Sequence, residues 1–279
     1  MSSKKSTVRK IISGFFAFLI SVFLFLVICL LVCQNTVFNY EYLMRSMEKS
    51  GYYEQLSEEI EEQFISYGAA SGFDQEVFDG IVDSQMVKND VDSIIKAMYQ
   101  NADEKLNTTA FQNHLYNTFI AYANQKEIQI TSEIDQSIRY LVDTCVNTYV
   151  KDISVPFADQ IGNLIVKFQK PIMIITYALS IAVIIFTLVI FLINHWKHRA
   201  VRNYIYALSG TFLMIAAIPI YFFIWGKIDQ IGIFSPALYH FVVLYITNIF
   251  LLLVGFAIGV LIILLLLILL YVMMRQAVQ

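Results

Sequence analysis

Residues 249–272 read IFLLLVGFAIGVLIILLLLILLYV and contain no charged side chain. The hydrocarbon core of a bilayer is roughly 30 Å thick, and an α-helix needs about 20 apolar residues to cross it. No water reaches that depth, so the backbone N–H and C=O groups must pair within the segment, as they do in a helix. This stretch therefore predicts a transmembrane helix.

Three further segments are equally long and apolar: residues 11–33, 171–193 and 204–225. Of the 279 residues, 58% are hydrophobic and 15% are charged, against roughly 25% charged in a soluble domain. The first segment exceeds the apolar core of a signal peptide and no A-x-A-like site follows it, so we expect an uncleaved anchor. The sequence predicts an all-α polytopic membrane protein with four transmembrane helices.

Charge is distributed unevenly along the chain. Residues 41–170 contain 10 basic and 21 acidic side chains, whereas the other positions contain 9 basic side chains and a single acid, Asp229. Cations concentrate on the cytoplasmic side of membrane proteins. With four crossings, eight cations share one side: Lys4, Lys5, Arg9, Lys10, Lys197, Arg199, Arg202 and Arg275. The opposite side has Lys167, Lys170 and Lys227, so both termini are expected in the cytoplasm.

These boundaries define the expected organisation of a multi-pass plasma-membrane protein. In chain order it comprises a basic cytoplasmic N-terminus (1–10), a first span (11–33), an extracytoplasmic α-helical domain (34–170), a second span (171–193), a basic cytoplasmic loop (194–203), a third span (204–225), a short external loop (226–235), a long helix containing the fourth span (236–274) and a cytoplasmic C-terminus (275–279).

The last hydrophobic segment is too long for a single perpendicular crossing. Ser235 and Pro236 form a typical helix start, and a helix over residues 236–274 would be about 58 Å long. We expect its beginning, up to about Tyr245, to lie outside the hydrocarbon and to pack against the outer domain. A re-entrant or interfacial segment is the alternative.

The segment 34–170 shows apolar residues at helical spacing and has no alternating stretch that would predict a sheet. Five amphipathic helices are expected around residues 53–67, 87–98, 111–122, 134–149 and 157–168, the last opened by Pro156. Each apolar face must be buried against another, which predicts a bundle of four or more helices inserted between the first and second spans.

The order of the spans resembles that of the claudins, which also place one large segment after the first span and a short loop between the third and fourth. Claudins carry a β-sheet outer segment with a W…GLW…C…C signature, whereas residues 34–170 contain no tryptophan and one cysteine. The resemblance concerns topology and implies no function.

Motifs for catalysis, nucleotide binding, cofactor binding and nucleic-acid binding are absent from the sequence. Cys145 lies on an apolar stripe and is expected to be a buried thiol. His195 and His198 have metal-compatible spacing but no carboxylate or cysteine partner, so an interfacial anchor is favoured over a metal site. We expect no catalytic, cofactor-binding or metal-binding residue. A catalytic site would have to be built around His114.

Three groups of residues are candidate sites. An intramembrane polar face is formed by His240, Thr247 and Asn248, which share one side of the last helix. Gly255 and Gly259 form a GxxxG pattern that permits close helix packing, within the chain or between protomers. A candidate surface for a cation or a partner consists of four acidic residues: Glu58, Glu59, Glu61 and Glu62.

The leading hypothesis is a non-catalytic bacterial plasma-membrane protein whose acidic outer domain binds an envelope component or partner protein. It would act as a sensor, adaptor or scaffold. The absence of a disulfide framework in 34–170 favours a bacterial envelope protein. Expected partners are the lipid bilayer and either another membrane protein or further copies of this chain, with no nucleic acid or nucleotide. One alternative is a transporter or channel subunit, with a path lined by His240, Thr247 and Asn248 and by small residues of the third span such as Ser209, Gly210 and Thr211. The other alternative is an envelope enzyme.

Overall fold

The computed structural model describes residues 2–102, 106–154, 158–194, 197–226, 232–233 and 235–276, and every regular element within them is helical. It confirms an all-helical chain with four helices long and apolar enough to cross a membrane. These candidate spans are Thr7–Asn35, Gln160–Ile193, Lys197–Trp225 and Pro236–Gln276.

The chain divides into two compact units. The apolar unit comprises Met1–Asn39, Lys167–Gln230 and Tyr245–Gln279, and the acidic unit comprises Tyr40–Val166 and Ile231–Leu244. The acidic unit contains 8 basic and 21 acidic residues, a net charge of −13.

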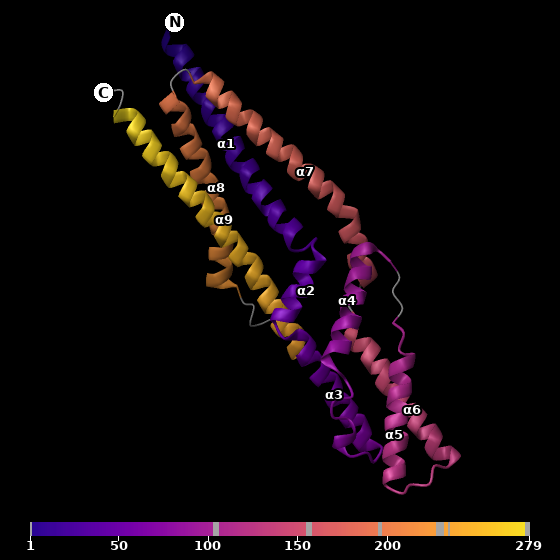
Figure 1. The fold of residues 1–279 in the computed structure, drawn as a ribbon. Coiled ribbons are helices and arrows are strands. Elements are labelled where there is room, and N and C mark those ends of the chain that lie inside the picture. The colour runs from indigo at the N-terminus through magenta and orange to yellow at the C-terminus, as the bar shows by residue number, and fades with distance from the viewer. Residues whose placement is uncertain are drawn as a thin grey trace. The chain divides into compact units, whose positions relative to one another are not determined.

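Helix α1 (Ser2–Asn35) is the central element of the apolar unit. It packs along α8 (Lys197–Trp225), and it also contacts the parts of α7 (Ala158–Ile193) and α9 (Pro236–Gln276) that belong to this unit (Figure 1). One buried cluster joins α1, α8 and α9 and contains Ile28, Val32, Ile215, Leu253, Ala257 and Val260. A second joins α1, α7 and α8 and contains Ala17, Ile20, Ile190, Ala200 and Ala207.

Hydrogen bonds join α1 to α7 near both ends of their contact. The Gln34 side-chain amide donates to Thr176 Oγ1 over 2.6 Å, and the Asn194 amide donates to Ser13 Oγ over 3.1 Å. The pairing order shows that the two helices are antiparallel. These bonds join polar side chains of the two helices across an otherwise apolar contact.

Helices α7 and α8 begin earlier than the predicted spans. Helix α7 starts at Ala158 and continues through Pro171, where the second span was expected to begin. Helix α8 starts at Lys197, so most of the basic segment predicted as a loop is helical. Composition marks only where a helix becomes apolar, whereas the hydrogen-bonded helix continues into more polar sequence. The predicted helix start at Pro156 and Phe157 lies outside the described residues, as do His195 and Trp196.

The acidic unit is built from shorter helices: α2 (Tyr40–Lys49), α3 (Tyr52–Ala70), the 3-10 turn η1 (Gln75–Val77), α4 (Ser84–Gln100), α5 (Thr109–Gln125) and α6 (Ser132–Ile153), with the first turns of α7 and α9. Helices α3 to α6 confirm four of the amphipathic helices predicted from apolar spacing, and α7 contains the fifth. Helix α2 and the turn η1 were not predicted.

Buried aromatic and aliphatic side chains form the core of the acidic unit. Ile60 and Phe64 of α3, Leu115 and Phe119 of α5, and Tyr149 of α6 are almost completely buried. The core also contains tyrosine hydroxyls, which α4 satisfies. Tyr53 donates to Asp92 over 2.6 Å, and Tyr149 donates to Asp90 over the same distance.

Residues 236–244, the first turns of α9, belong to the acidic unit. The Phe241 ring lies against Tyr52 of α3 with 5.7 Å between centroids, and His240 Nδ1 lies 2.6 Å from Gln55 Oε1. This agrees with the expected packing of the segment on the helical domain. Its position relative to a bilayer stays a prediction.

Candidate functional site

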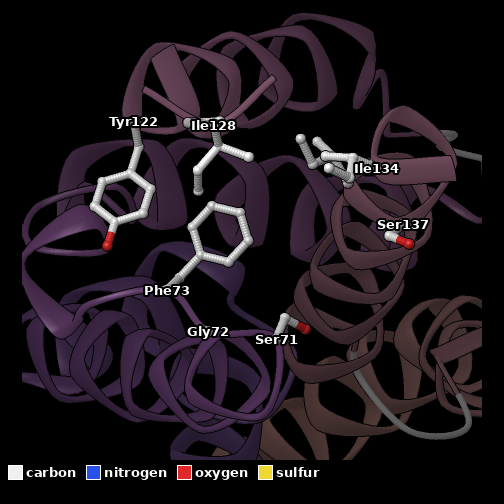
Figure 2. A pocket seen from close by; sticks show the side chains of 9 residues that line it. Ser71, Gly72, Phe73, Tyr122, Ile128, Ile134 and Ser137 are labelled. Atoms are coloured by element: carbon white, nitrogen blue, oxygen red, sulfur yellow. The ribbon is translucent and has the colours of Figure 1, made fainter. Parts of the chain in front are cut away.

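A cavity of about 330 Å³ opens on the surface of the acidic unit. It is lined by Ser71, Gly72, Phe73, Tyr122, Ala123, Ile128, Ile134, Ser137 and Ile138, and it is mainly apolar. Figure 2 shows the Ile128 and Phe73 side chains facing each other, with Tyr122 beside them and the hydroxyls of Ser71 and Ser137 at another part of the lining.

Two chain reversals create this cavity. After α3, Gly72 adopts a positive φ of 82°, which an L side chain rarely tolerates, and this turns the chain towards Phe73. After α5, Glu127 has a φ of 57°, and the Thr131 side chain accepts from the Ile134 backbone N–H to start α6. The cavity lies between these two reversals because each brings an apolar residue, Phe73 or Ile128, to the same place.

An aromatic cluster forms the rigid side of the cavity. The Phe73 ring lies 4.9 Å from the Phe119 ring and 5.3 Å from the Tyr122 ring, measured between centroids. Phe78, which is fully buried, contacts Phe119 at 5.4 Å. Offset aromatic contacts of this kind stabilise one ring arrangement, so this wall of the cavity is preformed.

The opposite side of the cavity exposes apolar surface to solvent. Ile128 is 44% exposed, and the nearby Ile130 is 36% exposed. Aliphatic side chains gain roughly 25 cal/mol for each Å² of apolar area removed from water, so a ligand covering them would be stabilised. Ile128 thus continues the apolar lining of the cavity to the solvent-exposed surface of the unit.

Charged groups lie beside the cavity but do not line it. The Lys126 ammonium contacts the Asp74 carboxylate at 2.8 Å, and this hydrogen bond lowers the pKa of Asp74. The backbone N–H of Asp74 donates to the Tyr122 hydroxyl over 3.3 Å. Apart from Tyr122, the lining residues carry no ionisable side chain. The cavity is therefore suited to holding an apolar group next to hydroxyls rather than to acid–base chemistry.

The four glutamates predicted as one surface have two different environments. Glu58 and Glu62 are exposed, whereas Glu59 and Glu61 are partly buried and hydrogen-bonded. Glu59 accepts from the Ala237 backbone N–H over 2.7 Å, and Glu61 accepts from the Gly80 backbone N–H over 3.0 Å. Only Glu58 and Glu62 therefore offer carboxylates directed to solvent.

The predicted polar face is divided between the two units. His240 belongs to the acidic unit, where it pairs with Gln55, whereas Thr247 and Asn248 belong to the apolar unit and are partly buried. Gly255 and Gly259 have space around them: a Cβ added to either would meet no atom within 4 Å in the part of the chain that the structure describes. The GxxxG pattern therefore makes no close helix contact there.

A different glycine mediates close helix packing. A Cβ at Gly210 of α8 would collide with the Ser21 side chain of α1. The neighbouring Thr211 is fully buried, and its hydroxyl lies 3.2 Å from the Ser21 carbonyl and 3.0 Å from that of Ala207. Gly210 and Thr211, expected to line a path in the transporter hypothesis, thus lie in a packed contact between α1 and α8.

The remaining candidates lie apart from the cavity. His114 is exposed on α5 and is not among the lining residues. Cys145 is a free thiol with no exposed surface, and burial raises its pKa to about 12. This confirms the buried thiol expected from the apolar stripe of α6. Cys29 and Cys33, also free thiols, lie in α1.

Sequence reasoning missed the cavity, because its lining comes from three separate segments of the chain. One signal was present: two isoleucines in the polar stretch EIQI at 127–130 fit no helical stripe. Comparison of the chain with known protein families, curated proteins and solved structures finds no match.

Proposed function

We propose that this chain is a non-catalytic plasma-membrane protein of a bacterium whose acidic unit is extracytoplasmic and binds a partner protein or envelope component. The cavity between Phe73 and Ile128 is the proposed recognition site. It would receive an apolar group of the ligand, and the protein would act as a sensor, adaptor or scaffold.

The observation that carries this proposal is the combination of a preformed aromatic wall with the exposed Ile128 at one cavity. Recognition sites that fix orientation commonly place a few polar groups beside such apolar surface, as Ser71 and Ser137 are placed here. The absence of ionisable acids and bases other than Tyr122 from the lining supports binding rather than catalysis.

Charge supports the choice of partner and of sidedness. A unit with a net charge of −13 attracts cationic ligands, so the partner segment is expected to combine an apolar side chain with basic neighbours. The cations flanking the spans support an external acidic unit.

Sidedness is tested by labelling an introduced thiol in intact cells. Asn147 is exposed on α6, and Asn147→Cys in a chain with Cys29, Cys33 and Cys145 replaced by alanine provides a single reactive thiol. A membrane-impermeant maleimide is expected to label this variant in intact cells. Labelling only after the membrane is opened would place the acidic unit in the cytoplasm and contradict the proposal.

Binding at the cavity is tested with a photo-crosslinking residue at position 128 of the full chain in its membrane. We expect one crosslinked species of defined mass, which a purified partner then reproduces. Ser137→Trp fills the cavity and should abolish the crosslinked product. A crosslinker at Tyr140, which is 77% exposed and outside the lining, is the matched control. Equal products from both positions, or a product unaffected by Ser137→Trp, would exclude the cavity as the site.

A further inference from the structure

The described part of the apolar unit contains cations but no acidic side chain. The ranges of this unit that the structure describes, 2–39, 167–194, 197–226 and 245–276, contain no aspartate or glutamate. The four ion pairs found among the described residues all lie in the acidic unit. Within these described ranges, no side-chain carboxylate of the unit can neutralise the cations.

Helices α1 and α8 place several of these cations at the same end of the apolar unit. The two helices run in the same direction, because Ala17 meets Ala200 and Ala207 in one cluster, whereas Ile28 and Val32 meet Ile215 in the next (Figure 1). Their basic starts are therefore neighbours. The cationic cluster consists of Arg9 and Lys10 of α1 with Lys197, Arg199 and Arg202 of α8.

The cationic cluster lies beside a packed contact among α1, α7 and α8. Arg9 and Lys10 lie about one turn before Ser13, which accepts from Asn194 at the end of α7. Arg199 directly precedes Ala200, which is buried against Ala17. The cations are thus attached to packed helix turns, which hold their backbones in place.

Arg202 lacks a hydrogen-bond partner that its burial requires. Its Nε–H group is buried and has no acceptor among the residues that the structure describes. A buried donor without an acceptor costs roughly 1–3 kcal/mol, and more when the group is charged. An anionic acceptor arriving from outside the chain would remove this cost.

The start of α8 favours the same kind of ligand. Its first turn contains Lys197 and Arg199 and no acidic residue, although the positive end of a helix dipole prefers negative charge. The cations and the dipole attract an anion together.

We propose that this cationic cluster binds the phosphate group of an anionic phospholipid, with Arg202 as the innermost donor. Basic pockets between transmembrane helices are suited to such headgroups because lipid phosphates lie at the level of the helix ends. Free phosphate has the same chemistry, but the ends of membrane-spanning helices meet the headgroup layer, which selects the lipid. This inference does not depend on the proposed function of the acidic unit.

The experiment compares phosphatidylglycerol with phosphatidylcholine on the purified full chain, with bound lipids counted by native mass spectrometry. We expect preferential retention of phosphatidylglycerol, and roughly fivefold weaker retention in Arg202→Gln, since each cation near a headgroup contributes about 1 kcal/mol. Lys170→Gln is the matched control, because it removes an exposed cation of the same unit outside the cluster. Its lipid preference should equal that of the original chain.

Two further arms decide the remaining alternatives. Inorganic phosphate should displace phosphatidylglycerol no better than chloride at equal ionic strength, and displacement at low phosphate concentration would assign the site to a soluble anion. Arg202→Lys retains the charge but loses Nε–H, so its retention should be intermediate. Arg199→Gln serves in place of Arg202→Gln if the latter does not fold. Equal retention of both lipids, or no loss in the Arg202 and Arg199 variants, would overturn the proposal.

Discussion

The Glu59 carboxylate of α3 accepts a hydrogen bond from the backbone N–H of Ala237, with 2.7 Å between Oε1 and the nitrogen. This contact completes the cap of α9. Pro236 has no N–H, Leu238 donates to the Ser235 hydroxyl over 3.1 Å, and Tyr239 donates to the Ser235 carbonyl over 3.0 Å. The backbone donors of residues 237–239 are thereby satisfied. Ser235 accepts from two of them, and the third depends on Glu59, which is remote in sequence.

Glu59→Ala is expected to loosen the start of α9. Loss of a side-chain cap costs about 1 kcal/mol, so the amides of 237–240 should exchange roughly fivefold faster with solvent. Hydrogen exchange of the peptide covering 236–244 measures this. Glu58→Ala removes a neighbouring carboxylate that is exposed and should leave the exchange unchanged. Equal effects of the two substitutions would show that Glu59 acts through overall charge.

Gly68→Ala is expected to destabilise the acidic unit although alanine favours helices. A Cβ at this position of α3 would collide with the Phe78 ring, which is fully buried. Overpacking costs about 1–3 kcal/mol, which exceeds the gain of up to about 1 kcal/mol from helix propensity. Hydrogen exchange of α3 peptides should show lower protection. Ser66→Ala, at an exposed position of α3, should raise protection slightly. Higher protection in Gly68→Ala would mean that the ring moves freely.

Cys145 is expected to resist alkylation in the folded chain. The thiol is buried and its pKa is raised to about 12, so almost no thiolate is present at pH 8. In a chain with Cys29 and Cys33 replaced by alanine, maleimide should react only after denaturation. Asn147→Cys, two residues along α6, should react at once under native conditions. Rapid reaction of Cys145 would contradict the burial.

The acidic unit is expected to lose stability as the pH rises above about 10, where tyrosines of the unfolded chain ionise. Burial raises the pKa of Tyr52 and Tyr99 to about 12, and burial with a hydrogen bond to aspartate raises the pKa of Tyr53 and Tyr149. The folded state therefore keeps protons that the unfolded state releases, and each such tyrosine destabilises folding by about 1.4 kcal/mol per pH unit until its folded pKa is reached.

Thermal unfolding of the full chain between pH 9.5 and 11.5 measures this effect. Tyr52→Phe should reduce the pH dependence, because one buried hydroxyl no longer titrates. Tyr140→Phe removes the hydroxyl of a tyrosine that is 77% exposed, so the pH dependence of the unfolding temperature should stay unchanged. A midpoint independent of pH over this range would contradict the prediction.

Much of the helical structure could be predicted from short-range patterns. The stripe of Leu56, Ile60 and Phe64 predicted α3, and the uncharged run at 249–272 predicted the apolar part of α9. Local periodicity suffices because one helical turn brings positions three and four apart to one face. It did not locate the start of α8, because the helix begins in the basic segment Lys197 to Arg202, before the long apolar run.

The candidate sites were less predictable. The sequence predicted equal roles for four glutamates, but Glu59 and Glu61 satisfy backbone donors of other segments. It also singled out Gly255 and Gly259, whereas glycines in close contact with another helix occur at Gly210 and Gly162. A spacing pattern states which residues share a face but not which other helix covers that face.

From its residues alone, the chain had to be helical with four segments able to span a bilayer, because uncharged runs of this length must pair their backbone groups internally. The burial of the Cys145 thiol was likewise predicted from a local pattern, the apolar stripe of α6. The tertiary structure decided which carboxylate caps α9, which glycine permits α1 to approach α8, and where Phe73 and Ile128 enclose a cavity. Each of these depends on segments far apart in the chain, and their contact is determined by the packing of whole helices rather than by any local pattern.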